Sequence, residues 1–449
     1  MGITKDLAEF VCQTKYDDFS SDVVSAAKNQ CLIALFAAVA GSRLNSGKAV
    51  INYVRECGAP PEAGVLGAGF RTSTEYAALV NGTTYHATEL EGNSQPEGMY
   101  LPPVVFPPFA LGEKLRLPGK KVLEGFILGF EVEARLGLAC MNAGHRGWVA
   151  TVSTGSIGVA AGAAKLLKLG VNETTMALSL AASQAAAGLV RQIGTGAHLY
   201  EAGIGGRNGI SAAMLAKHGL TGQPDILEGR GGLCDALGGE PEIDLQLGKD
   251  FRIKHTDYKK YPCCSQQQRI IDGVIYLIKE HNISYNNVES IEVDVSPDFL
   301  AIMKYVEPNN EDNARFCLPH SIAATLLDDE VFLDSYTDEK VRDPIFKEAR
   351  QKVRMIKRIE WTGTPEHLGL NRVTIKLKDG TEHKKDCINA KGDVSNPLND
   401  GEIKTLGMDC ALRVLPRDKA EQAAKMVLAL DEVRDVSELM SLLTFPAKQ

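Results

Sequence analysis

The chain has 449 residues, of which 44% are hydrophobic and 24% are charged, and its net charge is −8. These values are typical of a folded globular protein, and the length favours two or three domains. No segment concentrates lysine and arginine without interleaved acidic residues, so the charge pattern argues against binding to nucleic acid.

The N-terminal residues indicate neither export nor membrane attachment. They lack a basic stretch followed by an apolar core, and Asp6 breaks the myristoylation pattern. The longest apolar run, around Leu32 to Ala40, is shorter than the roughly 18 residues that a bilayer-spanning helix requires. Ten cysteines are scattered without a CxxC pair, which is typical of reduced thiols. We therefore expect a cytoplasmic protein with no membrane contact.

Helical spacing of apolar residues dominates the first half of the chain. The pattern predicts helices over 22–40, 120–140, 156–169, 173–187 and 207–218. Ser20 or Ser21 is a suitable N-cap for the first of them. Several are rich in alanine and glycine, whose small side chains let helices approach closely. A tightly packed helical body is the expected result.

The pattern changes after Pro262. A predicted helix over 266–280 precedes three alternating runs at 288–295, 355–361 and 373–377, which are typical of half-buried strands. The last run enters an Asp379-Gly380 turn of the hairpin type. Helices are predicted at 318–327, 419–430 and 436–443. The predicted fold class is mainly α with an inserted α+β domain: a helical domain of residues 1–262 and 398–449, and an α+β lid domain of residues 263–397.

Several segments, in order over nearly the whole chain, resemble the MmgE/PrpD family. They are Asn81-Gly82 leading to His86, Arg146-Gly147-Trp148 before a Gly/Ala-rich helix, Gly194-Thr195, Asn208-Gly209, Lys259-Lys260-Tyr261-Pro262 and Arg315-Phe316-Cys317-Leu318-Pro319. The family's known activities include 2-methylcitrate dehydration, cis-aconitate decarboxylation and iminodisuccinate epimerisation. The resemblance implies a helical domain with an α+β lid, a homodimer, a small carboxylate substrate, and neither a metal nor an organic cofactor.

The chain departs from the family pattern at positions that the resemblance marks as catalytic. The motif His-x-x-Asp-x-Asp-Asp reads here His86-Ala87-Thr88-Glu89-Leu90-Glu91-Gly92. Met99 and Val149 stand where the family has histidines, His198 where it has a lysine, and His320 where it has a tyrosine. The family's standard mechanism is therefore not carried over to this chain.

Histidines are the candidate catalytic groups. His86, His145, His198 and His320 lie in or beside the matched segments, and histidine can remove and return protons near neutral pH. The alternative for each is a structural, hydrogen-bonded histidine. Glu89 is a candidate to orient a histidine, although we expect Glu89 and Glu91 to point in different directions from the end of a helix.

The predicted substrate-binding residues are Arg146, Arg207, Lys259 and Glu201. The three cations suit a carboxylate, and a structural or solvated charge is the alternative for each. Glu201 follows His198 by three residues, which on a helix places it close enough to orient the imidazole. No HxxxH or HExxH pair is present, so we expect no metal; convergence of His86, His198 and His320 on zinc is the alternative.

The leading functional hypothesis is an enzyme that abstracts a proton α to a carboxylate of a small di- or tricarboxylate and then expels a β-leaving group. That is dehydratase-type lyase chemistry. Return of the proton to the opposite face would make the protein an epimerase or racemase, and decarboxylation is a further alternative. A hypothesis of another class is a non-catalytic relative that binds a ligand.

Overall fold

The computed structural model describes residues 2–185, 188–240, 244–328, 330–361 and 370–445, without the side chains of residues 142 and 145. The chain divides into two compact units. The helical unit contains Met1–Gln192, Gly196–Asp257 and Asn399–Gln449, and the α+β unit contains Ile193–Thr195 and Tyr258–Leu398. The predicted fold class, mainly α with an inserted α+β domain, is confirmed.

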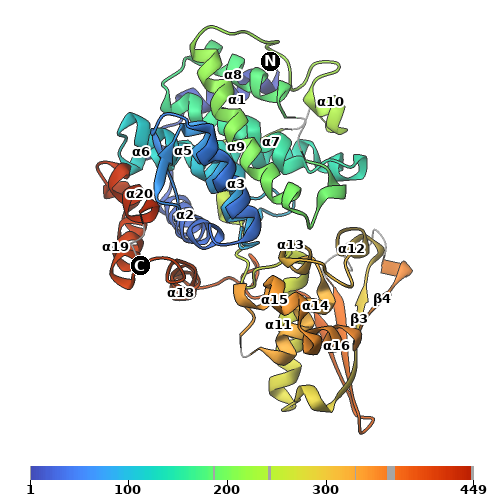
Figure 1. Cartoon of the computed structure of the whole chain (residues 1–449). Helices are drawn as coiled ribbons and strands as arrows, with labels where there is room; N and C mark the ends of the chain where they lie inside the picture. Colours follow the sequence, from blue (N-terminus) through green and yellow to red (C-terminus); the bar gives the residue numbers. More distant parts are fainter. Residues whose placement is uncertain (1, 186–187, 241–243, 329, 362–369, 446–449) are drawn as a thin grey trace. The chain divides into compact units, whose positions relative to one another are not determined.

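The helical unit is built from helices contributed by both ends of the chain (Figure 1). Its helices are α1 (Ile3–Gln13), α2 (Ser21–Gly41), α3 (Asn45–Cys57), α4 (Thr74–Ala87), α5 (Pro102–Leu115), α6 (Gly119–Ala139), α7 (Ala150–Leu166), α8 (Val171–Ser183), α9 (Gly196–Lys217), α10 (Leu233–Leu237), α18 (Asp400–Ala411), α19 (Arg417–Leu428) and α20 (Val436–Thr444). A two-stranded hairpin of β1 (Ala63–Val65) and β2 (Phe70–Thr72) packs against α4.

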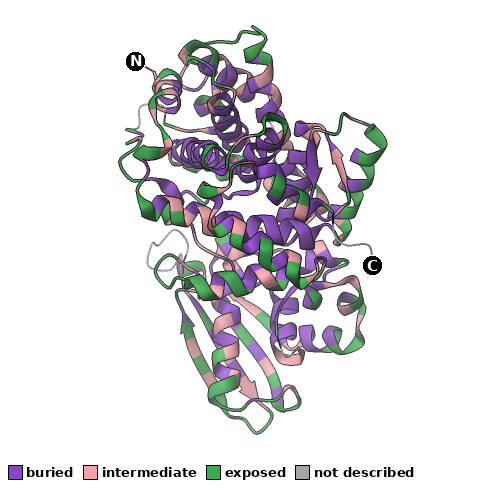
Figure 2. Cartoon of the chain, turned by 90° about the vertical axis from the view of Figure 1, so that its left-hand side faces the viewer, coloured by how far each residue is buried: buried purple, intermediate pink, exposed green. Residues whose placement is uncertain are grey.

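Glycines set how closely the central helices approach. Helix α9 packs against α4 and α7, and α7 packs against α6. At the α6–α7 contact, a Cβ added to Gly158 would lie 2.4 Å from the carbonyl oxygen of Gly129, so no larger residue fits there without moving a helix. Most residues of α4, α6 and α7 are buried, and Figure 2 shows buried helices in the interior of the helical unit. The small residues noted in the sequence thus serve helix packing, as predicted.

Helix α2 has the length and hydropathy of a membrane-spanning helix, which the shorter apolar run noted in the sequence did not suggest. In the structure 72% of its most apolar window is buried, and the helix packs against α4 and α18. Burial inside a protein explains its composition, because a core helix needs apolar residues on all sides.

The α+β unit contains a four-stranded sheet in the order β4-β3-β5-β6. The strands are β3 (Val288–Val295), β4 (Val353–Lys357), β5 (Asn371–Leu377) and β6 (Glu382–Cys387). The helices are α11 (Ser265–Glu280), α12 (Pro297–Ile302), α13 (Glu311–Ala314), α14 (Leu318–Leu327), α15 (Asp338–Arg342) and α16 (Pro344–Gln351). Strand β3 pairs parallel with β4 and antiparallel with β5, placing Val293 beside Val373 in one core with α11 and α14.

Most predicted elements are present, with shifted ends. The strand expected at 355–361 ends at Lys357, and Ile359–Trp361 is a 3-10 turn. Helix α9 begins at Gly196, eleven residues before the predicted start at Arg207. The hairpin turn at Asp379-Gly380 is confirmed, because Gly380 has a φ of +88° and joins β5 to β6. The first border between the units, predicted at 262/263, lies at Asp257/Tyr258, and the second, predicted at 397/398, lies at Leu398/Asn399.

Candidate active site

Two histidines meet inside the helical unit. His86 lies in the last turn of α4 and His198 in the first turn of α9. Their rings are 4.8 Å apart between centroids and cross at 68°, edge to face. Only 1% of His86 and 5% of His198 is exposed. Two imidazoles that lie together and away from bulk water can act as an acid/base pair on one substrate. Histidines scattered over the surface cannot.

Glycine packing between α4 and α9 brings these histidines together. A Cβ added to Gly82 would lie 3.1 Å from the Cα of Gly203, and one added to Gly203 would lie 2.1 Å from the carbonyl oxygen of Leu79. The two backbones therefore almost touch at this crossing. His86 follows Gly82 by one helical turn, and His198 precedes Gly203 by little more than one, so both rings emerge at the same end of the crossing.

Glu89 and Glu91 both approach His86, and the expectation that they point in different directions is wrong. The Nε2 atom of His86 lies 3.4 Å from Glu89 Oε1 and 3.7 Å from Glu91 Oε1. The helix ends at Ala87, and Glu89 adopts a left-handed backbone conformation with a φ of +54°. This turn folds the chain back over the helix end, so the helical spacing on which the expectation rested no longer applies.

The segment after Glu91 is hydrogen-bonded to a second segment of the chain, which ends at Asp257. The amide of Asn93 donates to Asp257 Oδ1 at 2.6 Å, and the amide of Gln95 donates to the carbonyl of His255. Glu97 forms a buried ion pair with Arg252, with an Nη2–Oε2 distance of 2.8 Å. These contacts fix the loop that leads into Tyr100.

Tyr100 completes the cluster over His86. The two rings are 4.9 Å apart, and the tyrosine side chain is buried. Burial, reinforced by the charges of Glu201, Glu91 and Glu89, raises the pKa of Tyr100 well above its usual value. The hydroxyl therefore keeps its proton at neutral pH, and it has no hydrogen-bond partner among the described residues.

Glu133 is a buried acidic group near Tyr100. It lies on α6, is fully buried, and neither of its carboxyl oxygens is hydrogen-bonded within the described part of the chain. Burial, with a smaller contribution from the charge of Glu97, raises the pKa of Glu133 well above the usual value for a carboxyl group. Burial thus favours the protonated form of both Glu133 and Tyr100, and neither residue was predicted from the sequence.

Glu201 lies beside His198, one turn further along α9. The distance from His198 Nδ1 to Glu201 Oε2 is 3.5 Å, and the other carboxylate oxygen accepts the amide of Leu189 at 3.4 Å. A carboxylate at this position favours the tautomer with the proton on Nδ1. The Nε2 atom of His198 is then the nitrogen that accepts a proton or a ligand.

The predicted cations of the helical unit lie elsewhere. Arg207 follows His198 by nine residues on α9, which is half a turn round the helix, and it hydrogen-bonds Asn208 Oδ1 at 3.2 Å. Arg146 is exposed and donates to the carbonyls of Asp235 and Ala236. In the described part of the chain, the hydrogen bonds of Arg207 and Arg146 are to residues outside the histidine cluster. The backbone of His145 lies in the 3-10 turn Met141–Arg146, and its side chain is outside the described residues.

His320 and Lys259 belong to the α+β unit. His320 lies on α14, where its Nε2 donates to the carbonyl of Ser335 at 2.9 Å and its Nδ1 faces Arg350 Nη1 at 3.4 Å. Burial lowers the pKa of His320 to about 4, so the ring is neutral. Because both nitrogens are engaged within the core of the unit, we omit His320 from the proposed acid/base groups. Lys259 is buried in the same unit.

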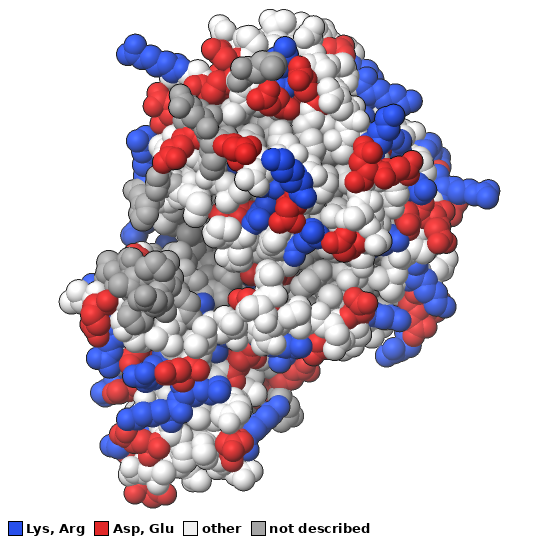
Figure 3. All heavy atoms as spheres, turned by 180° about the vertical axis from the view of Figure 1, so that it is seen from behind, with Lys and Arg blue, Asp and Glu red and all other residues white. Residues whose placement is uncertain are grey.

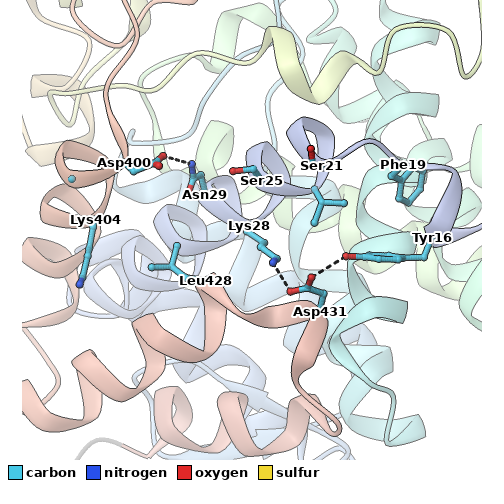
Figure 4. A pocket seen from close by; sticks show the side chains of 12 residues that line it. Tyr16, Phe19, Ser21, Ser25, Lys28, Asn29, Asp400, Lys404, Leu428 and Asp431 are labelled. Carbon is cyan, nitrogen blue, oxygen red and sulfur yellow. Dashed lines mark hydrogen bonds and ion pairs between the residues drawn. The ribbon is translucent and has the colours of Figure 1, made fainter.

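A groove of about 660 Å³ lies at another place on the helical unit, between α2 and the C-terminal helices (Figure 4). Five of its polar groups pair with one another: Lys28 pairs with Asp431, Tyr16 donates to Asp431, and Asn29 donates to Asp400. These five groups are less available to a ligand. On the face drawn in Figure 3, basic and acidic side chains are interspersed and neither forms one continuous patch.

Two family models match this chain. The model of the MmgE/PrpD N-terminal domain matches residues 5–246, and the model of the MmgE/PrpD C-terminal domain matches residues 261–432. The first match covers every residue of the histidine cluster described above. The second extends beyond Leu398, where the α+β unit ends, into the last helices of the helical unit.

Curated relatives match over the full length at low identity. A cis-aconitate decarboxylase of Aspergillus terreus is 24% identical, covering 100% of this chain and 97% of the relative. The cis-aconitate decarboxylase of Mus musculus is also 24% identical, covering 100% of this chain and 94% of the relative. A mitochondrial 2-methylcitrate dehydratase of Yarrowia lipolytica is 25% identical over 58% of this chain and 53% of its own length.

Proposed function

Because the chain belongs to the MmgE/PrpD family, we propose that it is a lyase that removes a proton α to a carboxylate of a small di- or tricarboxylate and expels a β-hydroxyl group as water. The observation that carries this proposal is the buried pair of His86 and His198, each beside a carboxylate. The relatives named as a decarboxylase and a dehydratase support lyase chemistry in general.

The geometry suggests separate roles for the two histidines. Glu201 favours the proton on Nδ1 of His198, which leaves Nε2 as the base that takes the substrate proton. A proton on Nε2 of His86 lies near both Glu89 and Glu91, which suits this ring to protonate the departing hydroxyl. The substrate then loses a C–H and a C–O bond and gains a double bond, and the two transferred protons balance.

Tyr100 and Glu133 are proposed to bind the substrate. Both are buried, burial favours their protonated forms, and Tyr100 lies against His86, so their O–H groups suit the oxygens of a carboxylate or a leaving hydroxyl. Neutral donors of this kind bind an anionic substrate without adding charge to a site already rich in glutamates. This proposal replaces Arg146 and Arg207 as binding groups within the helical unit.

The contact between the two imidazoles favours elimination over epimerisation. Inversion at carbon requires an acid/base group on each side of the carbon. The rings of His86 and His198 touch at 4.8 Å, which leaves no space for a substrate carbon between them. Decarboxylation remains the second candidate because full-length relatives carry that name.

The test is an incubation of the purified protein in deuterium oxide with 2-hydroxy, 2-amino and unsaturated di- and tricarboxylates, followed by proton NMR. We expect deuterium at the carbon α to a carboxylate, together with loss of water, and we expect both to disappear in His198→Gln. The exposed His218→Gln is the matched control. Inversion alone would indicate an epimerase and release of carbon dioxide a decarboxylase, while no turnover of any compound would favour a non-catalytic relative.

A further inference from the structure

We propose that His86, Glu89 and His198 bind a divalent transition-metal ion within the helical unit. Each of the three buried residues offers a ligand atom, and these atoms all lie within 4.8 Å of one another. Two imidazoles and one carboxylate are a donor set that Zn²⁺, Fe²⁺ and Co²⁺ accept with further coordination positions open. The proposal differs from the metal-free site that the sequence led us to expect.

The distances suit coordination by an ion placed between these groups. Two ligand atoms that each lie about 2.1 Å from a tetrahedral ion are about 3.4 Å apart. The Nε2 atom of His86 lies 3.4 Å from Glu89 Oε1, and Glu91 Oε1 is 3.7 Å from the same nitrogen, close enough to supply a fourth ligand. The widest separation, 4.8 Å, shortens to this range when one side chain shifts by about 1.4 Å.

Glu201 supports His198 in the way that outer carboxylates support metal-bound histidines. A ligating imidazole commonly donates its second N–H to a carboxylate, which fixes the tautomer and points the other nitrogen at the ion. His198 has this arrangement, with Nδ1 3.5 Å from Glu201 Oε2. Its Nε2 is therefore the proposed ligand atom. The amide of Leu189 donates a hydrogen bond to the Glu201 carboxylate and so helps to fix its position beside His198.

The backbone at Glu89 is a second indication that its side chain has a function. Glu89 is the second residue after the end of α4 and has a φ of +54°. Glycine is the usual residue at such a helix end, and a left-handed conformation costs other residues about 1–2 kcal/mol. A glutamate at this position is unfavourable for the turn, and its carboxylate lies against His86.

The surroundings of the cluster also favour a cation. Glu89 and Glu91 both lie within 3.7 Å of His86 Nε2, and Glu201 lies 3.5 Å from His198 Nδ1. Acidic groups held this close in a buried site repel one another, and a divalent ion reduces that repulsion. The Tyr100 hydroxyl, buried and without a partner among the described residues, is available to hydrogen-bond a water on the ion.

The metal site rests on these contacts and not on the proposed reaction. If His86 and His198 are the acid/base pair, a bound ion occupies the nitrogen lone pairs that the reaction uses. We therefore expect metal binding to suppress deuterium exchange into substrate. Increased exchange with metal would leave the site intact and overturn the roles proposed for the histidines, so the two proposals fail separately.

The experiment is a titration of the full-length, EDTA-treated protein with Co²⁺, followed by visible absorption and equilibrium dialysis. We expect one Co²⁺ per chain and displacement by Zn²⁺, which binds comparable sites tightly. Glu89→Gln and His198→Gln should each weaken binding by about tenfold or more. His198→Lys should abolish it, because an ammonium group has no lone pair and repels the ion.

The control variant is His383→Gln. His281 and His383 stack at 3.8 Å in the α+β unit and are the other pair of adjacent histidine rings in the described structure. Binding that is unchanged in His383→Gln and lost in His198→Gln supports the proposal, provided that far-UV circular dichroism shows both variants folded. Absence of Co²⁺ binding to the wild type, or its loss in His383→Gln instead, overturns the proposal.

Discussion

Substitution of Gly203 by alanine tests how α4 and α9 bring the histidines together. The new Cβ would lie 2.1 Å from the carbonyl oxygen of Leu79 and 2.4 Å from Thr83 Oγ1, far inside normal contact distance. Because one obstacle is backbone, α4 and α9 must separate by about 1 Å, and overpacking of this kind costs about 1–3 kcal/mol. His86 and His198 lie about one turn from the crossing, so their contact should widen as well.

Unfolding in urea, with midpoint and slope measured together, gives the loss of stability for Gly203→Ala. Gly401→Ala is the matched control: Gly401 is exposed on α18, its nearest neighbour is the side-chain oxygen of Asn399 at 3.2 Å, and alanine favours the helix by up to about 1 kcal/mol. We expect only Gly203→Ala to be destabilised and to lose activity. A Gly203→Ala protein with wild-type stability would refute this account of the α4–α9 crossing.

Three further predictions concern single side chains. The raised pKa of Glu133 means that the folded state keeps a proton that the unfolded state releases. The free energy of unfolding therefore falls as pH rises above about 4.5, by about 1.4 kcal/mol per pH unit until the folded-state pKa is passed. Glu133→Gln should flatten this dependence in denaturation curves from pH 5 to 8, and an unchanged slope would contradict the prediction. The pKa of His320 is lowered from 6.5 to about 4, so the unfolded state binds a proton at a higher pH than the folded state does. The free energy of unfolding of the α+β unit should therefore fall by about 3 kcal/mol as pH falls from 6.5 to 4. Amide hydrogen exchange in α14 measures this change, and equal protection at both pH values would exclude it. Tyr100→Phe removes a buried hydroxyl without a described partner, so stability should be unchanged or higher while deuterium exchange into substrate falls at least about tenfold; loss of stability with full activity would assign Tyr100 a structural role.

The periodic parts of the fold were predictable from sequence. The alternating run at β3 and the apolar helix α14 have the predicted bounds, because their side chains face one core with a regular period. Strand β6 was missed because its residues Glu382–Cys387 are almost all polar, and it lies at the edge of the sheet. The first half of α9 was missed because glycines lower helix propensity, and packing against neighbouring helices such as α4 and α7 stabilises the helix.

The candidate site was predictable only in part. The resemblance directed attention to His86 and His198, and spacing placed Glu201 beside His198. The approach of Glu91 to His86 depends on the left-handed turn at Glu89, which no helical spacing anticipates. Tyr100 and Glu133 come from a loop and from a different helix, so their proximity exists only in three dimensions.

The most direct test of the central claim is the rate of α-proton exchange in deuterium oxide for the wild type and His198→Gln, with a substrate identified in the panel. General base catalysis by a positioned side chain contributes about 10²- to 10⁴-fold, so we expect the rate to fall within that range while His218→Gln exchanges normally. Equal rates in the wild type and His198→Gln would show that His198 is not the base and would contradict the function proposed for the histidine cluster.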